Sequence, residues 1–195
     1  MRVEVRTVLF GVQYKEPEDY RSLPTPEIKV LLTRCPNSDA VSLPKREFTG
    51  NEYLDEATQF PKELSVYTEQ VHTYDTRSIE ADEPVLVVLY LGLASNTDTG
   101  DWYSISTAAT ELNEAEEHFL VDAYNKLRDT IDDKLFYLLP EKFTLTQAQG
   151  IYDSITGYPL KPPHFRRKIA DKVKETDEFT KKAGHRPARL FTKGV

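Results

Sequence analysis

Two consecutive helix signals near the C-terminus constrain the fold more than any other feature of this sequence. The first helix is predicted to begin after Thr144, because Thr144 and Gln147 have the spacing of a capping box, in which each side chain hydrogen-bonds to the other residue's backbone amide. Apolar residues then recur every three or four positions: Leu145, Ala148, Ile151, Tyr152 and Ile155. Gly157 follows, and glycine at that place is a typical helix end.

A second, basic helix is predicted directly after the turn at residues 158–160. Pro162 and Pro163 suit its first turn, where proline removes no intrahelical hydrogen bond. A spacing of four residues defines its inner face: Phe165, Ile169 and Val173. Four basic side chains remain on its other faces: Arg166, Arg167, Lys168 and Lys172. Residues 183–187 then indicate a wing tip, and helix, turn, basic helix and basic hairpin together are typical of a winged helix-turn-helix DNA-binding module.

The distribution of charge is consistent with such a module. The chain as a whole has a formal net charge of −7. Residues 161–195 contain eleven Lys/Arg and four Asp/Glu, whereas residues 1–160 contain 14 basic and 28 acidic residues, so a tail of +7 follows a body of −14. A polyanion is attracted by the tail and repelled by the body. A solvated basic tail explains the charge equally well, and only the embedded apolar periodicity favours a folded module.

Composition bounds the class of protein. The 195 residues include 39% hydrophobic and 29% charged ones, as in an ordinary soluble domain with a core. The longest apolar run, Val85–Ala94, is half of what a membrane-spanning helix needs, and charged residues interrupt the N-terminus where a signal peptide is apolar. With Cys35 as the single cysteine, no intramolecular disulfide can form. We therefore expect a cytoplasmic protein with no membrane partner.

Three stretches near the C-terminus carry a family resemblance: FTLTQAQGIYDSITGYPL, HFRRKIAD and GHRPARLF. In this order they resemble the C-terminal domain of the Nudix-related transcriptional regulators. In that family a Nudix-like domain senses a metabolite, and a winged helix at the C-terminus binds the operator. The combination of the three stretches is specific, although each one alone is a weak signal.

The rest of the chain is predicted to be a mixed α/β domain. Strands are expected at residues 2–10, 27–32, 66–74, 85–94 and 102–105. An amphipathic helix of about eighteen residues follows the capping pair Asn113 and Glu116. Residues 49–64 are ambiguous, because apolar residues at helical spacing are followed by Pro61.

The predicted fold class is α/β (α+β), with a Nudix-like α/β/α sandwich followed by a small winged helix-turn-helix domain. The sandwich is assigned to residues 1–139 and the winged helix to residues 140–195. The resemblance to the regulators extends here to Leu43-Pro44, to residues 67–74 and to residues 138–140. It implies that the first domain senses an effector and forms a homodimer.

The motif that supports Nudix catalysis is degenerate in this sequence. A Nudix hydrolase presents R-E-x-x-E-E on a helix after a glycine-rich loop, and its glutamates bind divalent cations. Here Lys45 and Arg46 replace the glycine pair, and Pro61 falls where the first metal-binding glutamate is expected. Three remaining acids could hold Mg²⁺ but are more typical of a solvated surface: Asp55, Glu56 and Glu63. We therefore predict no catalytic residue, no metal and no cofactor.

Seven residues are the predicted DNA contacts: His164, Arg166, Arg167, Lys168, Lys172, His185 and Arg186. Arginine can bind guanine through two hydrogen bonds, whereas lysine more often neutralises phosphate. The resemblance implies a dimeric repressor that binds a palindromic double-stranded DNA operator and responds to a sugar, sugar phosphate or ADP-ribose-like effector of the nucleotide-sugar class. Two alternatives stay open: a residual Nudix-type nucleotide-sugar pyrophosphatase, and a protein-interaction module that has lost both activities.

Overall fold

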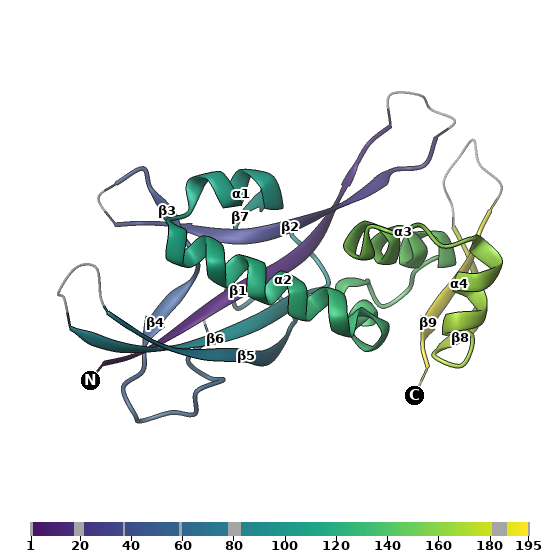
Figure 1. The fold of residues 1–195 in the computed structure, drawn as a ribbon. Helices are drawn as coiled ribbons and strands as arrows, with labels where there is room; N and C mark the ends of the chain where they lie inside the picture. The colour runs from purple at the N-terminus through teal and green to yellow at the C-terminus, as the bar shows by residue number, and fades with distance from the viewer. Residues whose placement is uncertain are drawn as a thin grey trace.

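The computed structural model describes residues 2–17, 22–36, 38–58, 60–77, 83–180 and 187–194. Within these ranges the chain forms a mixed sheet, helices along it, and a helix-hairpin module at one end (Figure 1). The sheet strands are β1 (Arg2–Lys15), β2 (Thr25–Arg34), β3 (Val41–Ser42), β4 (Lys45–Glu47), β5 (Val66–Arg77), β6 (Pro84–Ala94) and β7 (Asp101–Ser104). Their order is β3-β2-β1-β6-β5, with β4 paired to β1 and β7 paired to β2.

Two parallel strands, β1 and β6, form the interior of the sheet. They pair in register from Arg2 opposite Val85 to Phe10 opposite Leu93. Nearly all of β6 is buried, as its continuous apolar sequence predicted. A strand covered on both faces needs apolar side chains on both, which is why Val85–Ala94 shows no alternation of polar and apolar residues.

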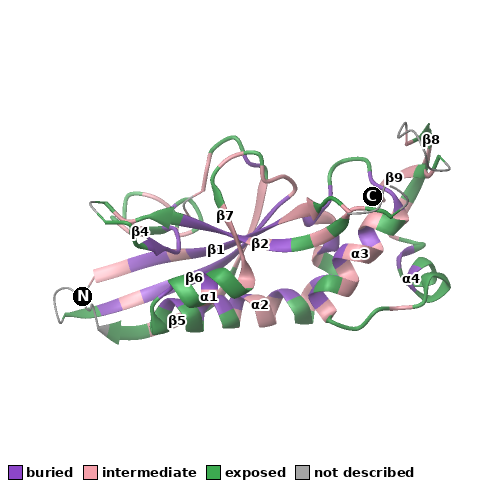
Figure 2. Cartoon of the chain, turned by 90° about the horizontal axis from the view of Figure 1, so that it is seen from above, coloured by how far each residue is buried: buried purple, intermediate pink, exposed green. Residues whose placement is uncertain are grey.

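Helices cover one face of the sheet, and irregular chain covers the other (Figure 2). α1 (Ile105–Glu111) and α2 (Glu114–Lys134) lie on the helical face, where α2 buries Phe119, Leu120, Ala123, Leu127 and Ile131. On the other face the ambiguous segment forms turns at residues 54–57, closed by short-range backbone hydrogen bonds. Ala57 of these turns is fully buried in one cluster with Val5 and Val88. The helical spacing in this segment therefore reflects contacts with the sheet and not a helix.

α2 runs along the helical face and is anchored where it begins. Asn113 caps it, as predicted, by accepting a hydrogen bond from the Glu116 amide at 3.0 Å. The Glu116 side chain is almost fully buried and accepts a hydrogen bond from Arg6 of β1. Burial raises the pKa of this carboxyl, and the charge of Arg6 opposes that shift.

No helix in the described part of the chain is long and apolar enough to cross a lipid bilayer.

The C-terminal module contains η1 (Leu135–Leu138, a 3-10 turn), α3 (Leu145–Thr156), α4 (Pro162–Ile169) and the antiparallel hairpin of β8 (Val173–Phe179) and β9 (Arg189–Lys193). The predicted capping box of Thr144 and Gln147 is present, and Gly157 ends α3 in the left-handed region with a φ of 71°. One expectation was wrong, because α4 ends at Ile169, and Lys172 and Val173 lie after it. The Lys172 amide donates to the Ile169 carbonyl at 2.9 Å, a tight turn that leads directly into β8.

One continuous hydrophobic core joins this module to the sheet. Phe143 and Phe165 of the module belong to the same buried cluster as Phe10 of β1. Gly150 lets α3 approach β2 closely, since a Cβ atom at this position would lie 3.0 Å from Cγ of Pro26. The predicted boundary between the two domains falls within this shared core, and it stays a prediction.

Candidate nucleic-acid interface and ligand pocket

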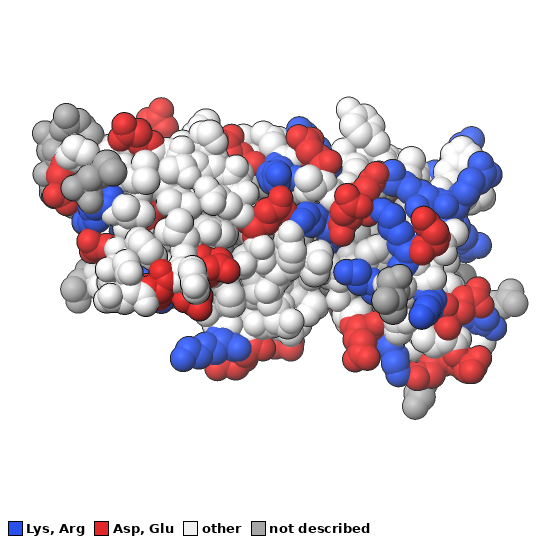
Figure 3. All heavy atoms as spheres, turned by 90° about the horizontal axis from the view of Figure 1, so that it is seen from below, with Lys and Arg blue, Asp and Glu red and all other residues white. Residues whose placement is uncertain are grey.

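α4 has one buried face and one basic face. Phe165 and Ile169 are buried, and the Phe165 ring packs 5.5 Å from the ring of Tyr152 in α3. Arg167 lies two residues beyond Phe165, which places it on the opposite side of the helix. Three of the predicted DNA contacts have exposed side chains without a hydrogen bond or ion pair to any described residue: His164, Arg166 and Arg167. Figure 3 shows many basic side chains at the end of the molecule that carries this module, with acidic side chains among them.

Two other predicted DNA contacts, Lys168 and Lys172, contact the C-terminal end of α2. Lys168 Nζ lies 2.7 Å from Oδ2 of Asp132, near the end of α2. Lys172 Nζ donates to the Asp132 carbonyl at 2.9 Å and to Oδ1 of Asp133 at 3.1 Å. The hydrogen bond to Asp132 raises the pKa of Lys168. A negative charge near the C-terminal end of a helix is repelled by the unpaired carbonyl groups there. The two lysines therefore offset the unfavourable charges of Asp132 and Asp133.

The turn between the two helices is held by side chains of α3. The Leu160 amide donates to Oδ1 of Asp153 at 3.0 Å, and Nε2 of Gln149 donates to the Leu160 carbonyl at 2.7 Å. Thr156 Oγ1 lies 3.4 Å from both the amide nitrogen and the carbonyl oxygen of Tyr158. Sequence reasoning missed this bracing, because the two α3 partners are seven and eleven residues from Leu160 and match no local motif.

The hairpin brings a further arginine to this end of the molecule. Arg189 of β9 pairs with Glu175 of β8, and its guanidinium lies 5.4 Å from the centre of the Phe179 ring. Glu175 and Arg189 also line a groove of about 550 Å³ together with Arg166 and the start of α3. The predicted contacts His185 and Arg186 lie outside the described residues.

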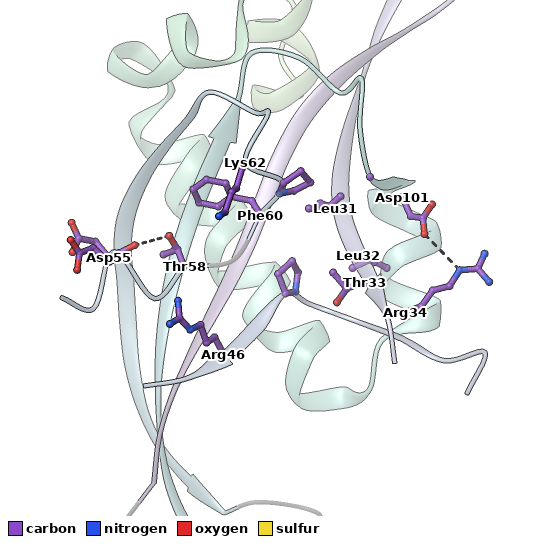
Figure 4. A pocket seen from close by; sticks show the side chains of 14 residues that line it. Leu31, Leu32, Thr33, Arg34, Arg46, Asp55, Thr58, Phe60, Lys62 and Asp101 are labelled. Carbon is purple, nitrogen blue, oxygen red and sulfur yellow. Dashed lines mark hydrogen bonds and ion pairs between the residues drawn. The ribbon is translucent and has the colours of Figure 1, made fainter. Parts of the chain in front are cut away.

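A separate cavity of about 850 Å³ lies on the irregular face of the sheet (Figure 4). Its apolar part includes Leu31 of β2 and Phe60. Three basic and three acidic residues also line it: Arg34 of β2, Arg46 of β4 and Lys62, with Asp55, Glu56 and Asp101. Arg46 is held by Glu52 at 2.8 Å, and Arg34 lies 3.7 Å from Asp101. In the sequence Arg46 stands out only because it replaces a motif glycine, and no local pattern joins it to Arg34 and Lys62.

The acidic residues near this cavity form hydrogen bonds within the turns. Glu56 Oε2 accepts a hydrogen bond from the Tyr53 amide at 2.9 Å, and the Asp55 carbonyl accepts one from Thr58 Oγ1 at 2.6 Å. These acids therefore do not share a helix face, as the metal-binding glutamates of a Nudix hydrolase must. No group of three or more His, Cys, Asp or Glu side chains among the described residues has the geometry of a metal site.

Comparisons with known proteins identify relatives of both parts of the chain. Residues 135–192 match the family model described as the NrtR DNA-binding winged helix domain. The ADPR responsive transcriptional repressor NtrR of Acinetobacter baylyi is 30% identical over an alignment of 144 residues, which covers 65% of this chain and 56% of that protein. The chain thus spans just over half the length of that curated relative.

Solved structures show the fold. The crystal structure of Shewanella oneidensis NrtR complexed with a 27mer DNA matches with a TM-score of 0.72 at 22% identity, covering 98% of this chain and 93% of that one. A MutT/nudix family protein from Enterococcus faecalis matches with a TM-score of 0.64 at 16% identity, covering 100% of this chain and 88% of that one. The predicted fold class, a mixed α/β Nudix-like domain followed by a winged helix, is confirmed, but in the described residues helices cover one face of the sheet, where the predicted α/β/α sandwich has them on both. The resemblance of the C-terminal stretches to the regulators is confirmed by the family match over residues 135–192.

Proposed function

We propose that this protein is a transcriptional repressor of the NrtR type, in which a Nudix-like domain binds an effector and a winged helix binds DNA. The observation that carries the proposal is the basic face of α4, where His164, Arg166 and Arg167 are exposed without a partner among the described residues. Exposed cations on a short helix, held rigidly from behind by Phe165, are suited to the major groove. The winged-helix family match over residues 135–192 supports the same role.

The basic residues divide into two groups on this proposal. Arg167, with His164 beside it, is the first candidate for base contacts, because it lies opposite the buried face of α4. Lys168 and Lys172 contact α2 and are available to phosphate only when those contacts open or are shared. His185 and Arg186 remain proposed contacts of the wing. A palindromic operator bound by a homodimer, with one module on each half-site, completes the proposal.

The effector is proposed to bind in the cavity beside β2 and β4. Its volume of about 850 Å³ lies in the range of small-molecule sites. Arg34, Arg46 and Lys62 suit a diphosphate, and Phe60 with the neighbouring proline rings offers apolar surface to a base or sugar. ADP-ribose has this combination of groups, and the curated relative is described as responsive to ADPR. Sugar phosphates share the anionic part alone.

Hydrolysis of the effector is not part of the proposal. The segment that should carry the catalytic glutamates forms turns at residues 54–57, and Glu56 is hydrogen-bonded to a backbone amide. Incubation of the protein with ADP-ribose and Mg²⁺ or Mn²⁺ should release no product above the uncatalysed background. Turnover that is lost in Glu56→Gln would instead favour the pyrophosphatase alternative.

DNA binding is tested by selecting fragments of the organism's own genome on the immobilised protein and titrating the selected site at several salt concentrations. Wild-type affinity should fall linearly on a log–log plot, with a slope of about −0.9 for each phosphate neutralised. Arg167→Ala should weaken binding by a factor of about 5 to 150, as expected when one base contact is lost. The control Arg128→Ala removes the same charge from an exposed position on α2 and should bind like wild type. Failure to retain any preferred DNA sequence would favour the protein-interaction alternative.

Effector binding is tested by calorimetry with ADP-ribose. Arg46→Ala should weaken binding about 10- to 100-fold, as expected when a hydrogen bond to a charged group is lost. Arg128→Ala again serves as the control, since Arg128 does not line the cavity. Equal affinities for wild type and Arg46→Ala would place the effector elsewhere.

A further inference from the structure

Two tyrosines are far more exposed than the other aromatic residues of the described chain. Tyr53 is 78% exposed and Tyr158 is 79% exposed. Tyr53 lies in the turns on the irregular face of the sheet, distant in sequence from the basic module. Tyr158 lies between α3 and α4, directly before the basic helix. Single exposed rings are common on protein surfaces, so the case for Tyr158 depends on its surroundings and not on exposure alone.

The backbone beneath Tyr158 is held from both sides. Gly157 precedes it in the left-handed conformation that ends α3, and its amide donates to the Asp153 carbonyl at 2.9 Å. Leu160, two residues later, is held by the side chains of Asp153 and Gln149. The Tyr158 ring itself has no described partner, in contrast to its backbone. A side chain with two torsions on a fixed backbone loses little entropy when a partner immobilises it.

The beginning of α4 lacks the backbone donors that helices commonly offer to phosphate. Pro162 and Pro163 occupy its first two positions and have no N–H group. The next two amides, of His164 and Phe165, both donate to the Lys161 carbonyl, at 2.9 and 3.2 Å. Phosphate at this helix end must therefore be held by side chains. The Lys161 side chain is exposed here without a described partner, and Tyr158, three residues earlier in the chain, carries a neutral donor.

We propose that Tyr158 contacts DNA directly, with its phenolic hydroxyl donating to a backbone phosphate at the edge of the groove that α4 enters. Tyrosine is among the side chains that donate to phosphate in protein–DNA complexes. In this role Tyr158 replaces the amide donors that Pro162 and Pro163 remove, and Lys161 supplies positive charge beside it. The inference rests on the proposed DNA-binding function and adds a contact that the basic residues alone do not predict.

The test compares Tyr158→Phe with wild type on the selected DNA, at several salt concentrations. Loss of one hydrogen bond should weaken binding about 2- to 10-fold. The salt slope should stay unchanged, because the lost group carries no charge. Lys161→Ala should weaken binding and also reduce the slope by about 0.9. The matched control is Tyr53→Phe, at a position of nearly equal exposure, and its affinity should equal that of wild type. Thermal melting of Tyr158→Phe should match wild type, since the hydroxyl has no described partner.

The outcomes separate this inference from the function on which it rests. If the wild-type protein retains no preferred DNA sequence, the proposed function fails and the inference fails with it. If wild type binds DNA and Tyr158→Phe binds equally tightly, the function stands and the hydroxyl contact is wrong. If only Tyr158→Ala weakens binding, the ring packs on DNA without hydrogen bonding, and donation to phosphate is likewise overturned.

Discussion

Phe165→Ala tests whether the winged helix and the sheet unfold as one unit. Phe165 is fully buried in the cluster that also contains Phe10 of β1. Removing a buried phenylalanine side chain costs about 3–5 kcal/mol, a large part of the roughly 5–15 kcal/mol that stabilises a domain. For a chain of this length, 1 kcal/mol lowers Tm by about 2–4 °C. The expected decrease is therefore about 6–20 °C.

The single tryptophan allows unfolding of the sheet to be followed separately from loss of helix. Trp102 lies in β7, within the sheet, so its fluorescence reports unfolding of the sheet, while circular dichroism reports the helices. A shared core predicts that both signals shift together in Phe165→Ala. The control Phe179→Ala changes a half-exposed ring of the hairpin and should leave Tm within about 2 °C, as surface substitutions usually do. A Trp102 transition at the wild-type temperature, beside an earlier loss of helix, would refute the shared core.

Three further predictions concern other contacts. Asp132→Asn should weaken the contact that holds Lys168 near the end of α2. DNA binding should then become stronger and its salt dependence steeper. Unchanged affinity and an unchanged salt slope would show that Lys168 does not contact DNA. Burial alone would raise the pKa of Glu69, but its ion pairs with Lys134 and Lys126 of α2 lower it. The unfolded state therefore takes up the proton first, and the stability of the protein should fall as the pH decreases below about 4.3. In Glu69→Gln this acid-induced fall in Tm should be smaller, and a pH profile identical to wild type would contradict the ion pairs. Gly150→Ala should lower Tm although alanine favours helices, because its Cβ would crowd Pro26; a higher Tm would show that α3 can move away.

Features fixed by neighbours in the sequence were predictable. The caps of α2 and α3 and the stop at Gly157 each depend on groups within three or four residues, so their sequence patterns corresponded directly to structure. α1 was not predicted, because it is only seven residues long and offers no long apolar period. The end of α4 was placed too late for a related reason: Val173 continues the spacing of four, yet it begins a strand.

The candidate sites depended more on long-range contacts. The exposed positions of His164, Arg166 and Arg167 followed from helix periodicity. The engagement of Lys168 by Asp132 joins residues 36 positions apart, and no local pattern encodes it. The basic set around the cavity likewise comes from β2, β4 and the turns after residue 54, which only the folded sheet brings together. Sequence periodicity identified which side of each helix is exposed. It could not identify which residues of other elements contact that side.

The core shared by the two halves has a consequence for synthesis on the ribosome. The Phe10 ring, made early, packs 6.0 Å from the Tyr124 ring, and the hydroxyl of Tyr124 donates to the Ile155 carbonyl. Phe143 pairs through its backbone with Phe191, at the end of the chain. Residues far apart in the sequence therefore contribute to one core, and contacts so distant in sequence form slowly. A chain released before this module is complete would leave Tyr124 without its Ile155 contact and the shared core unfinished, and such chains are cleared by chaperones and proteases.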